Sequence, residues 1–171
     1  IVFASVYGNQ RFGMSTTQMI TYFILAQFTS ILGAALFGWL TDRLNVKVSL
    51  SISLLIWIAV VIWAFFCGSA REYYYVGLVA GLAIGSSQAN SRTMLSMLTP
   101  VNRQAEFFGF YTLTGRLSSI IGPIIYGWIA HKTGDIRFSI LSLILFFILG
   151  FIALQGVRLE EGKAQALNMK E

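Results

Sequence analysis

Two arginines, Arg92 and Arg116, stand inside long apolar segments of this 171-residue chain. A charge at the centre of a lipid-embedded helix costs about 2.5–3.5 kcal/mol on insertion scales, so each arginine needs a partner or a function. At helical spacing each arginine shares one face with glycine and polar residues, and the opposite face is apolar. The two faces are Gly81, Gly85, Gln88, Arg92 and Ser96, and Gly109, Thr112, Arg116, Ser119 and Pro123. We therefore expect two helices that turn one side to lipid and the other to protein, water or a solute.

Arg116 is expected near the middle of the membrane. It follows Glu106 by ten residues, which is about 15 Å of helix rise, and an arginine cannot easily reach the headgroups from that depth. Two partners would suit it: an acid outside this chain, or an anionic group on a solute, such as the carboxylate of an amino acid. The alternative is a structural arginine that is bonded by backbone carbonyls before Pro123.

Together the polar residues of these two helices indicate a wet cavity. Arg92 has a structural alternative, because its long side chain could reach the headgroups near the end of its helix. Glu106 has one as well, since a carboxylate in the first turn of a helix is favoured by the helix dipole. The candidate cavity-lining and substrate residues are Gln88, Asn90, Arg92, Thr112, Arg116 and Ser119.

The composition is that of a membrane protein. Hydrophobic residues make up 56% of the chain and charged residues 11%, against about 25% charged residues in soluble domains. The twelve Lys and Arg are scattered along the sequence, so no nucleic-acid partner is expected. One cysteine and one histidine leave no intrachain disulfide and no Cys/His metal site, and nothing indicates a cofactor.

Long apolar runs predict one compact bundle over residues 1–158, followed by a polar cytoplasmic tail over residues 159–171. About 20 apolar residues are enough for a helix to cross the hydrocarbon of a bilayer. The first segment begins in apolar sequence without a methionine and is expected to be the end of a truncated helix. The expected spans lie near 1–7 (partial), 17–40, 48–67, 73–98, 106–129 and 138–157.

The connecting segments and small residues add detail to this bundle. Residues 8–15 are expected to form a loop, and the span 48–67, which has no polar stripe, is expected to face lipid at the periphery. Gly33 and Gly38 predict a close contact between helices, and the pair Gly122 and Pro123 is able to kink its helix.

Loop charges indicate an orientation. Loops 41–47 and 99–105 together with the tail carry six Lys and Arg, against four in the other loops. The excess favours the first set as the cytoplasmic side.

Two stretches of the sequence resemble a known family. Gly38-Trp-Leu-Thr-Asp-Arg-Leu-Asn-Val-Lys47 resembles the G-x-x-x-D-R loop signature of the major facilitator superfamily, with Asn45 where glycine is common. Residues 88–123, with Q-x-x-S-R, a proline, E-F-F-G-F-Y, G-R-x-S-S and G-P, resemble the tenth and eleventh helices of one branch of that superfamily. The branch includes the vacuolar amino-acid effluxers linked to autophagy and their bacterial relatives.

This resemblance implies an all-α membrane protein, the C-terminal six-helix half of a twelve-helix transporter with helix seven partial. The implied partners are the lipid bilayer, the N-terminal six-helix half and a small-molecule solute. The implied location is a multi-pass position in the bacterial inner membrane, or in a vacuolar-type membrane if the source is eukaryotic. The resemblance also implies a charge latch at the cytoplasmic end, in which Asp42 pairs with Arg92; its candidate members are Asp42, Arg43, Arg92 and Glu106.

Two function classes follow from the sequence. The first is a secondary active transporter that moves a small polar solute, such as an amino acid, by alternating access. The second is a membrane receptor or scaffold that keeps the transporter fold without transport. An intramembrane enzyme has no support, because no H-E-x-x-H motif, no Ser/His or Ser/Lys pairing and no paired buried acids are present.

Overall fold

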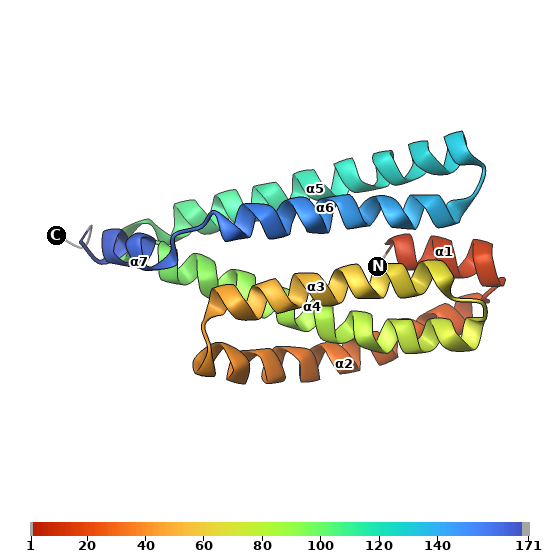
Figure 1. Cartoon of the computed structure of the whole chain (residues 1–171), viewed down its shortest axis with the longest axis horizontal. Coiled ribbons are helices and arrows are strands. Elements are labelled where there is room, and N and C mark those ends of the chain that lie inside the picture. Colours follow the sequence, from red (N-terminus) through yellow and green to blue (C-terminus); the bar gives the residue numbers. More distant parts are fainter. Residues whose placement is uncertain (1, 169–171) are drawn as a thin grey trace.

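The protein, seen in a computed structural model that describes residues 2–168, is helical nearly throughout (Figure 1). No strand occurs among these residues, so the predicted all-α fold class is confirmed. The elements are α1 (Val2–Phe12), α2 (Thr16–Arg43), α3 (Val46–Phe66), α4 (Ala70–Leu98), the short 3-10 helix η1 (Val101–Arg103), α5 (Gln104–Thr133), α6 (Ile136–Gln155) and α7 (Leu159–Asn168).

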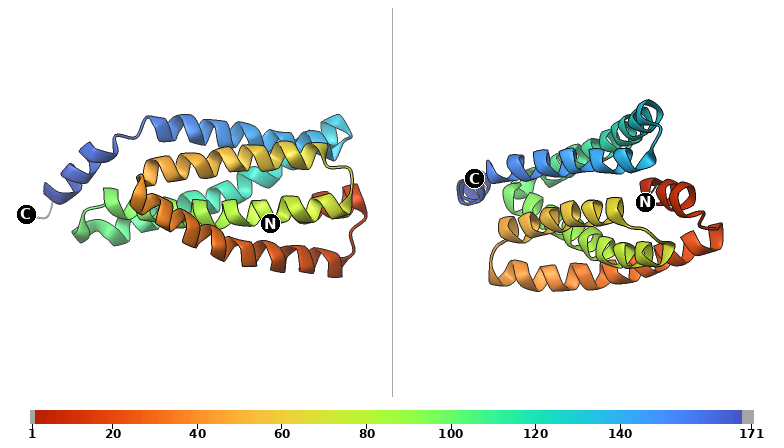
Figure 2. Two further views of the ribbon diagram at one scale, coloured as in Figure 1. Left: turned by 60° about the horizontal axis from the view of Figure 1, so that its bottom comes forward. Right: turned by 45° about the vertical axis from the view of Figure 1, so that its right-hand side comes forward.

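The long helices run side by side along one axis, and the chain reverses direction at each short turn (Figure 1). α2 packs most extensively on α4, α3 packs on both α4 and α6, and α5 packs mainly on α6. The α7 helix continues beyond the end of α6 as a separate short element (Figure 2). We call the end that carries the α2–α3 turn, the α4–α5 turn and α7 the α7 end. The opposite end carries the loops 13–15, 67–69 and 134–135.

Polar side chains start the helices at the points where the chain turns. The Ser15 side chain and the Gln18 side chain form a capping box at the start of α2, which satisfies two backbone N–H groups that have no partner inside the helix. The Asn45 side chain accepts a hydrogen bond of 2.8 Å from the Val48 N–H at the start of α3. Ser69 caps α4 and Asp135 caps α6 in the same way. Each of these helices therefore begins within a few residues of the end of the preceding helix.

Two connections differ from the prediction. The expected loop over residues 8–15 is helical through Phe12, because Gly8 allows α1 to continue close to Met19 and Tyr73. A Cβ at Gly8 would lie 2.8 Å from the Met19 Sδ atom. The expected charged turn over 41–47 is reduced to Leu44 and Asn45, so that most of its charged residues belong to helices.

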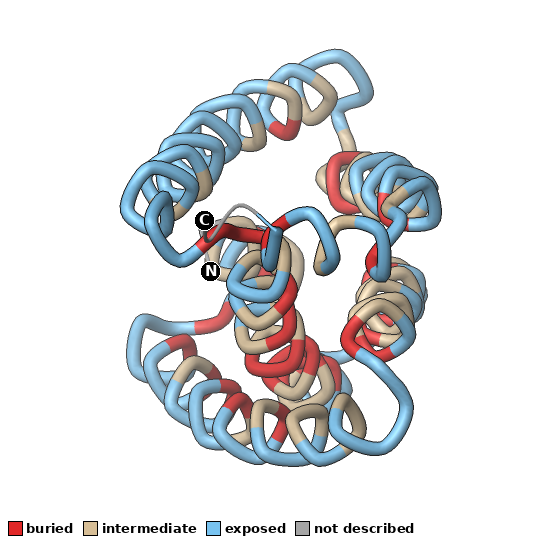
Figure 3. The backbone as a smooth tube through the Cα atoms, turned by 90° about the vertical axis from the view of Figure 1, so that its left-hand side faces the viewer, coloured by how far each residue is buried: buried red, intermediate tan, exposed pale blue. Residues whose placement is uncertain are grey.

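Three helices of the described chain, α2, α3 and α6, are long and apolar enough to cross a membrane. α4 and α5 are longer still, with 29 and 30 residues, but they carry the polar stripes. Their membrane crossing stays a prediction, which their course alongside α3 and α6 supports (Figure 1). Buried positions gather where the helices face one another and the outer sides are exposed, as expected for a bundle with lipid around it (Figure 3).

Glycines on one face of α4 bring it into backbone contact with α2. A Cβ at Gly85 would overlap the Ser30 carbonyl and lie 3.0 Å from the Ala34 nitrogen. From the other side, Gly33 lies against Leu82, where a Cβ would approach the Leu82 Cα atom to 2.7 Å. Small residues permit such close packing of helices in lipid. The Gly81 and Gly85 part of the first polar stripe is thus buried between helices rather than in a cavity.

The remaining predicted packing residues behave differently. Nothing lies within 4 Å of a Cβ placed on Gly38. α5 is helical through Pro123, so the proline does not interrupt it. Gly122 faces α1, where a Cβ would lie 3.2 Å from the Phe3 ring.

Candidate functional site

A buried polar cluster joins three helices near the α7 end. The Asn90 side chain on α4 donates to the Ser49 Oγ on α3 at 2.8 Å and accepts from the Thr41 Oγ1 on α2 at 2.9 Å. The Ser49 hydroxyl in turn donates to the Phe37 carbonyl at 3.2 Å. Asn90 is 1% exposed and Ser49 is fully buried. The Asn90 amide and the Ser49 hydroxyl are thus both hydrogen-bonded inside the bundle. These bonds connect α2, α3 and α4 and fix their register.

This cluster corrects two predictions. Asn90 was expected to line a wet cavity, but its amide is enclosed between helices. The span 48–67 was expected to lack a polar face, yet Ser49 and Ser53 are both fully buried toward its neighbours. Two serines four residues apart mark one helical face, and this spacing was the signal in the sequence that pointed to a packed rather than a lipid-facing side.

The predicted Asp42–Arg92 latch is not formed. Within residues 2–168 the ion pairs shorter than 4.0 Å are Arg158–Glu161 and Lys163–Glu160, both local pairs in or next to α7. Asn90 faces α2, and Arg92 lies two residues further along α4, about 200° around the helix. The Arg92 side chain is therefore exposed on a face of α4 that points away from α2, the helix that carries Asp42. The other two latch candidates are also exposed: Arg43 stacks over the Trp39 ring at 5.5 Å, and Glu106 lies in the first turn of α5.

A different contact closes the α7 end. The Lys47 ammonium group donates to the Gln155 carbonyl at 2.8 Å and to the Val157 carbonyl at 2.9 Å. Gln155 is the last residue of α6 and Val157 lies two residues beyond it, where a cation is favoured by the unpaired carbonyls and the helix dipole. The Gln155 side chain also donates to the Ser51 Oγ at 3.0 Å. The start of α3 is thus fastened to the end of α6.

Removing the Lys47 ammonium is expected to loosen this end. Lys47→Met keeps much of the apolar stem but leaves two carbonyls without a donor, and we expect the free energy of unfolding to fall by about 1–3 kcal/mol. Thermal unfolding of the full-length protein in detergent measures the change. Lys132→Met, at an exposed position of the opposite end, is the matched control. Equal melting temperatures for the two variants would contradict a stabilising role for Lys47.

The second polar stripe lies on the exposed surface of α5. Thr112, Arg116 and Ser119 are all exposed, and among the residues of α5 only Tyr126 is buried. The two hydroxyls bond to carbonyls of their own helix, Thr112 to Phe108 at 2.9 Å and Ser119 to Arg116 at 2.6 Å. Arg116 and Thr112 line a shallow hollow that Gly109 leaves open. The face therefore presents a guanidinium with no carboxylate partner in the described chain.

Gln88 and Arg92 are both exposed on α4. Ser91, which lies between them in the sequence, connects α4 to α5 by a hydrogen bond. The Ser91 Oγ lies 2.9 Å from the Tyr111 hydroxyl. Apart from this bond, α4 and α5 touch little, and α5 is carried mostly by α6.

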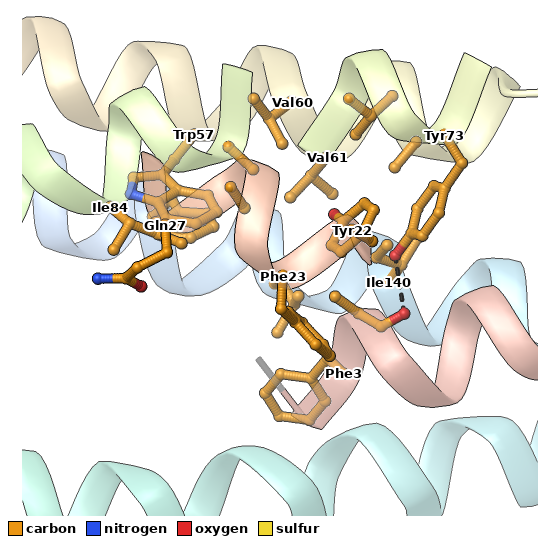
Figure 4. A pocket seen from close by; sticks show the side chains of 17 residues that line it. Phe3, Tyr22, Phe23, Gln27, Trp57, Val60, Val61, Tyr73, Ile84 and Ile140 are labelled. Carbon is orange, nitrogen blue, oxygen red and sulfur yellow. Dashed lines mark hydrogen bonds between the residues drawn. The ribbon is translucent and has the colours of Figure 1, made fainter. Parts of the chain in front are cut away.

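An apolar cavity of about 250 Å³ lies among α1, α2, α3, α4 and α6 (Figure 4). Aromatic rings form much of its wall, with Tyr22 stacked on Tyr73 at 4.9 Å between ring centroids. The Tyr73 hydroxyl donates to the Ala4 carbonyl at 2.9 Å and holds α1 against α4. The cavity has no charged lining residue, so it suits an apolar group and offers nothing to a free charge. No group of three or more His, Cys, Asp or Glu able to hold a metal occurs in residues 2–168.

The sequence matches the family described as "Vacuole effluxer Atg22 like" over residues 1–167. The chain belongs to this family. Relatives of the Atg22-like chain include the uncharacterized MFS-type transporter YxiO of Bacillus subtilis, 27% identical over 157 residues, which cover 92% of this chain and 36% of the relative. Autophagy-related protein 22 of Kluyveromyces lactis is 28% identical over 174 residues, which cover 95% of this chain and 35% of the relative.

The Atg22-like chain therefore spans about a third of the length of these relatives. Autophagy-related protein 22 of Saccharomyces cerevisiae adds a third match, 24% identical over 179 residues and 34% of its own length. No solved structure matches the chain. The family and its MFS-type relative confirm the predicted resemblance and the predicted integral, multi-pass membrane location. A role in a cavity stays a prediction for Gln88, Arg92, Thr112, Arg116 and Ser119.

Proposed function

We propose that the protein to which this chain belongs is a secondary active transporter that moves a small polar solute by alternating access, with this chain as one of its two halves. The Atg22-like family and the MFS-type relative support transport as the activity. The chain offers one bundle of long helices, and a second bundle would complete a cavity between them. The α7 end, which carries the larger number of Lys and Arg, is taken as the cytoplasmic side.

The single observation that carries this proposal is the position of Arg116. It is the thirteenth residue of the 30-residue helix α5, about 18 Å of helix rise from the helix start. No acid of the described chain pairs with it. A guanidinium at that depth is costly in lipid and must face protein, water or a ligand. The exposed stripe that also contains Thr112 and Ser119 gives it a polar surface to lie on.

The solute that fits this stripe carries a carboxylate, as an amino acid does. The planar guanidinium binds a carboxylate through two parallel hydrogen bonds, whereas lysine offers a single point charge. The amide of Gln88 on α4 is also exposed and would offer such a solute a second polar group. Binding energy at Arg116 would be available only while the pathway is closed around the solute, which couples binding to the rearrangement.

Arg116→Lys tests this role. The full-length protein is reconstituted in liposomes, and counterflow is measured with a mixture of radiolabelled amino acids. We expect the substitution to reduce the initial rate at least tenfold, because the bidentate geometry is lost while the charge is kept. The melting temperature should equal that of the parent, since Arg116 makes no ion pair in the described chain.

Arg103→Lys is the matched control, because Arg103 is an exposed arginine in the η1 turn at the start of the same helix hairpin. It should transport as the parent does. Normal transport by Arg116→Lys would contradict the solute-binding role. A parent protein that moves no solute of this class would instead favour a receptor or scaffold.

A further inference from the structure

The described residues of α7 pack on the end of α4 mainly through apolar contacts. Leu159 and Ala166 are each 7% exposed, and together with Gly162 they form one helical face. Leu159 packs in a small core with Val46, Met94 and Leu154. The side-chain hydrogen bonds of α7 are local: Arg158, just before the helix, donates to Glu161, and Lys163 donates to Glu160.

Gly162 sets how closely α7 approaches α4. A Cβ at this position would lie 2.5 Å from the Leu98 Cδ2 atom. Leu98 is the last residue of α4, so α7 covers the point at which that helix ends. Any larger side chain at position 162 would push α7 away from Leu98 or force Leu98 to move.

The segment that leads into α7 is held much more firmly than α7 itself. Lys47 binds the carbonyls of Gln155 and Val157 just before α7 begins. A charge-assisted pair of hydrogen bonds thus anchors the hinge, while the apolar side chains of Leu159 and Ala166 and the close approach of Gly162 hold the helix. The weaker attachment is the one that opens first.

The α4–α5 corner lies directly beside the docked helix. It runs from Thr99 and Pro100, which are buried, into the exposed 3-10 turn Val101–Arg103. Beyond the corner, α5 is tied to α4 by the Ser91–Tyr111 hydrogen bond and by few other contacts. Movement of α5 relative to α4 therefore requires a change of backbone conformation at this corner.

We propose that α7 is a detachable brace on the α4–α5 corner, hinged at the Lys47-bound segment. Docked, it holds the end of α4 against α3 and α6 and keeps the corner closed. Released, it frees the corner, so that α5 and its polar stripe can move relative to α4. The importance of this motion for transport rests on the proposed transporter function, whereas the brace itself is a property of the fold.

A reversible disulfide tests the brace without any solute. The double variant Leu98→Cys and Gly162→Cys is made in the full-length protein with Cys67→Ala, and hydrogen–deuterium exchange is followed in the oxidised and the reduced protein. Oxidation should slow exchange of residues 99–105 at least tenfold. A helix that merely covers the small core would gain protection in α7 only, and that result would overturn the proposal.

A second variant covers the case in which the double cysteine protein does not fold. Gly162→Leu should lift α7 and raise exchange of residues 99–105 at least threefold, while Ala164→Leu, at an exposed position of the same helix, should leave it unchanged. Equal exchange in these two variants would also overturn the brace.

Transport by the reconstituted double cysteine protein connects the brace to function. Oxidation should lower the counterflow rate at least tenfold, and reduction should restore it. Equal rates in both states would overturn a role of the brace in the transport cycle. Slowed exchange in a protein that moves no amino acid in either state would support the brace and count against the proposed transporter function.

Discussion

Gly85→Ala is expected to lower the free energy of unfolding by about 3 kcal/mol, which is at the upper end for overpacking. The added methyl group would overlap the Ser30 carbonyl and approach the Ala34 nitrogen to 3.0 Å. Both are backbone atoms of α2, so no side chain can rotate away and the helix pair must separate. Because α2 and α4 form the most extensive contact of the bundle, the separation would reach the buried cluster around Asn90 as well. Thermal unfolding of the full-length protein in detergent measures the loss.

Gly115→Ala is the control for this substitution. Gly115 is also a helical glycine, but nothing lies within 4 Å of a Cβ at that position. Alanine there should leave the stability unchanged or raise it slightly, since alanine is the better helix former. Similar melting temperatures for the two alanine variants would show that α2 and α4 do not pack through Gly85.

Asn90→Leu is also expected to destabilise the bundle. It removes the hydrogen bonds to Ser49 and Thr41, which measure 2.8 and 2.9 Å, and leaves their polar atoms facing an apolar group. Hydrogen bonds between membrane helices contribute about 0.6 kcal/mol on average and up to about 1.7. The loss of two bonds should therefore lower the free energy of unfolding by about 1–3 kcal/mol.

Two further variants distinguish the cluster from a general effect of leucine. Gln88→Leu, at an exposed position one half-turn earlier on the same helix, should leave the melting temperature nearly unchanged. The double variant Asn90→Leu with Ser49→Ala should lose less stability than the sum of the single variants, because both remove the same bond. Additive losses would argue against the hydrogen bond as the source of stability.

The helices could be predicted well from the sequence, because long apolar runs separated by capping residues leave few other folds. The contact partners of individual side chains were harder to predict than the helices. The Asp42–Arg92 latch was inferred from the family resemblance, but Asn90 and Arg92 face different sides of α4, and it is Asn90 that contacts α2. The contacts that do hold the α7 end use backbone carbonyls at and just beyond the end of α6 as acceptors. Every residue has a carbonyl, so no residue type in the sequence marks such a contact in advance.

The candidate site divides along similar lines. The polar stripe of α5 is exposed, but so is most of the helix, so its role in a cavity stays a prediction. The glycines of α4 were assigned to the same polar stripe as Arg92, whereas they pack on α2. Glycine has the same appearance in a sequence whether it borders water or another helix, and only the partner helix decides between the two.

Cysteine labelling along α5 tests the central claim, that the stripe with Thr112, Arg116 and Ser119 faces the solute pathway. Thr112→Cys and Leu113→Cys are made in the full-length protein with Cys67→Ala and treated with a membrane-impermeant methanethiosulfonate. Cys67 itself is 2% exposed, and burial raises the pKa of its thiol, so its removal eliminates only a weak background. Leu113 and Thr112 are both exposed on the isolated bundle, hence a difference between them reports what covers each side in the membrane. We predict that the cysteine at 112 reacts at least tenfold faster than that at 113 and is protected by transported solute; equal rates, or faster reaction at 113, would contradict the claim.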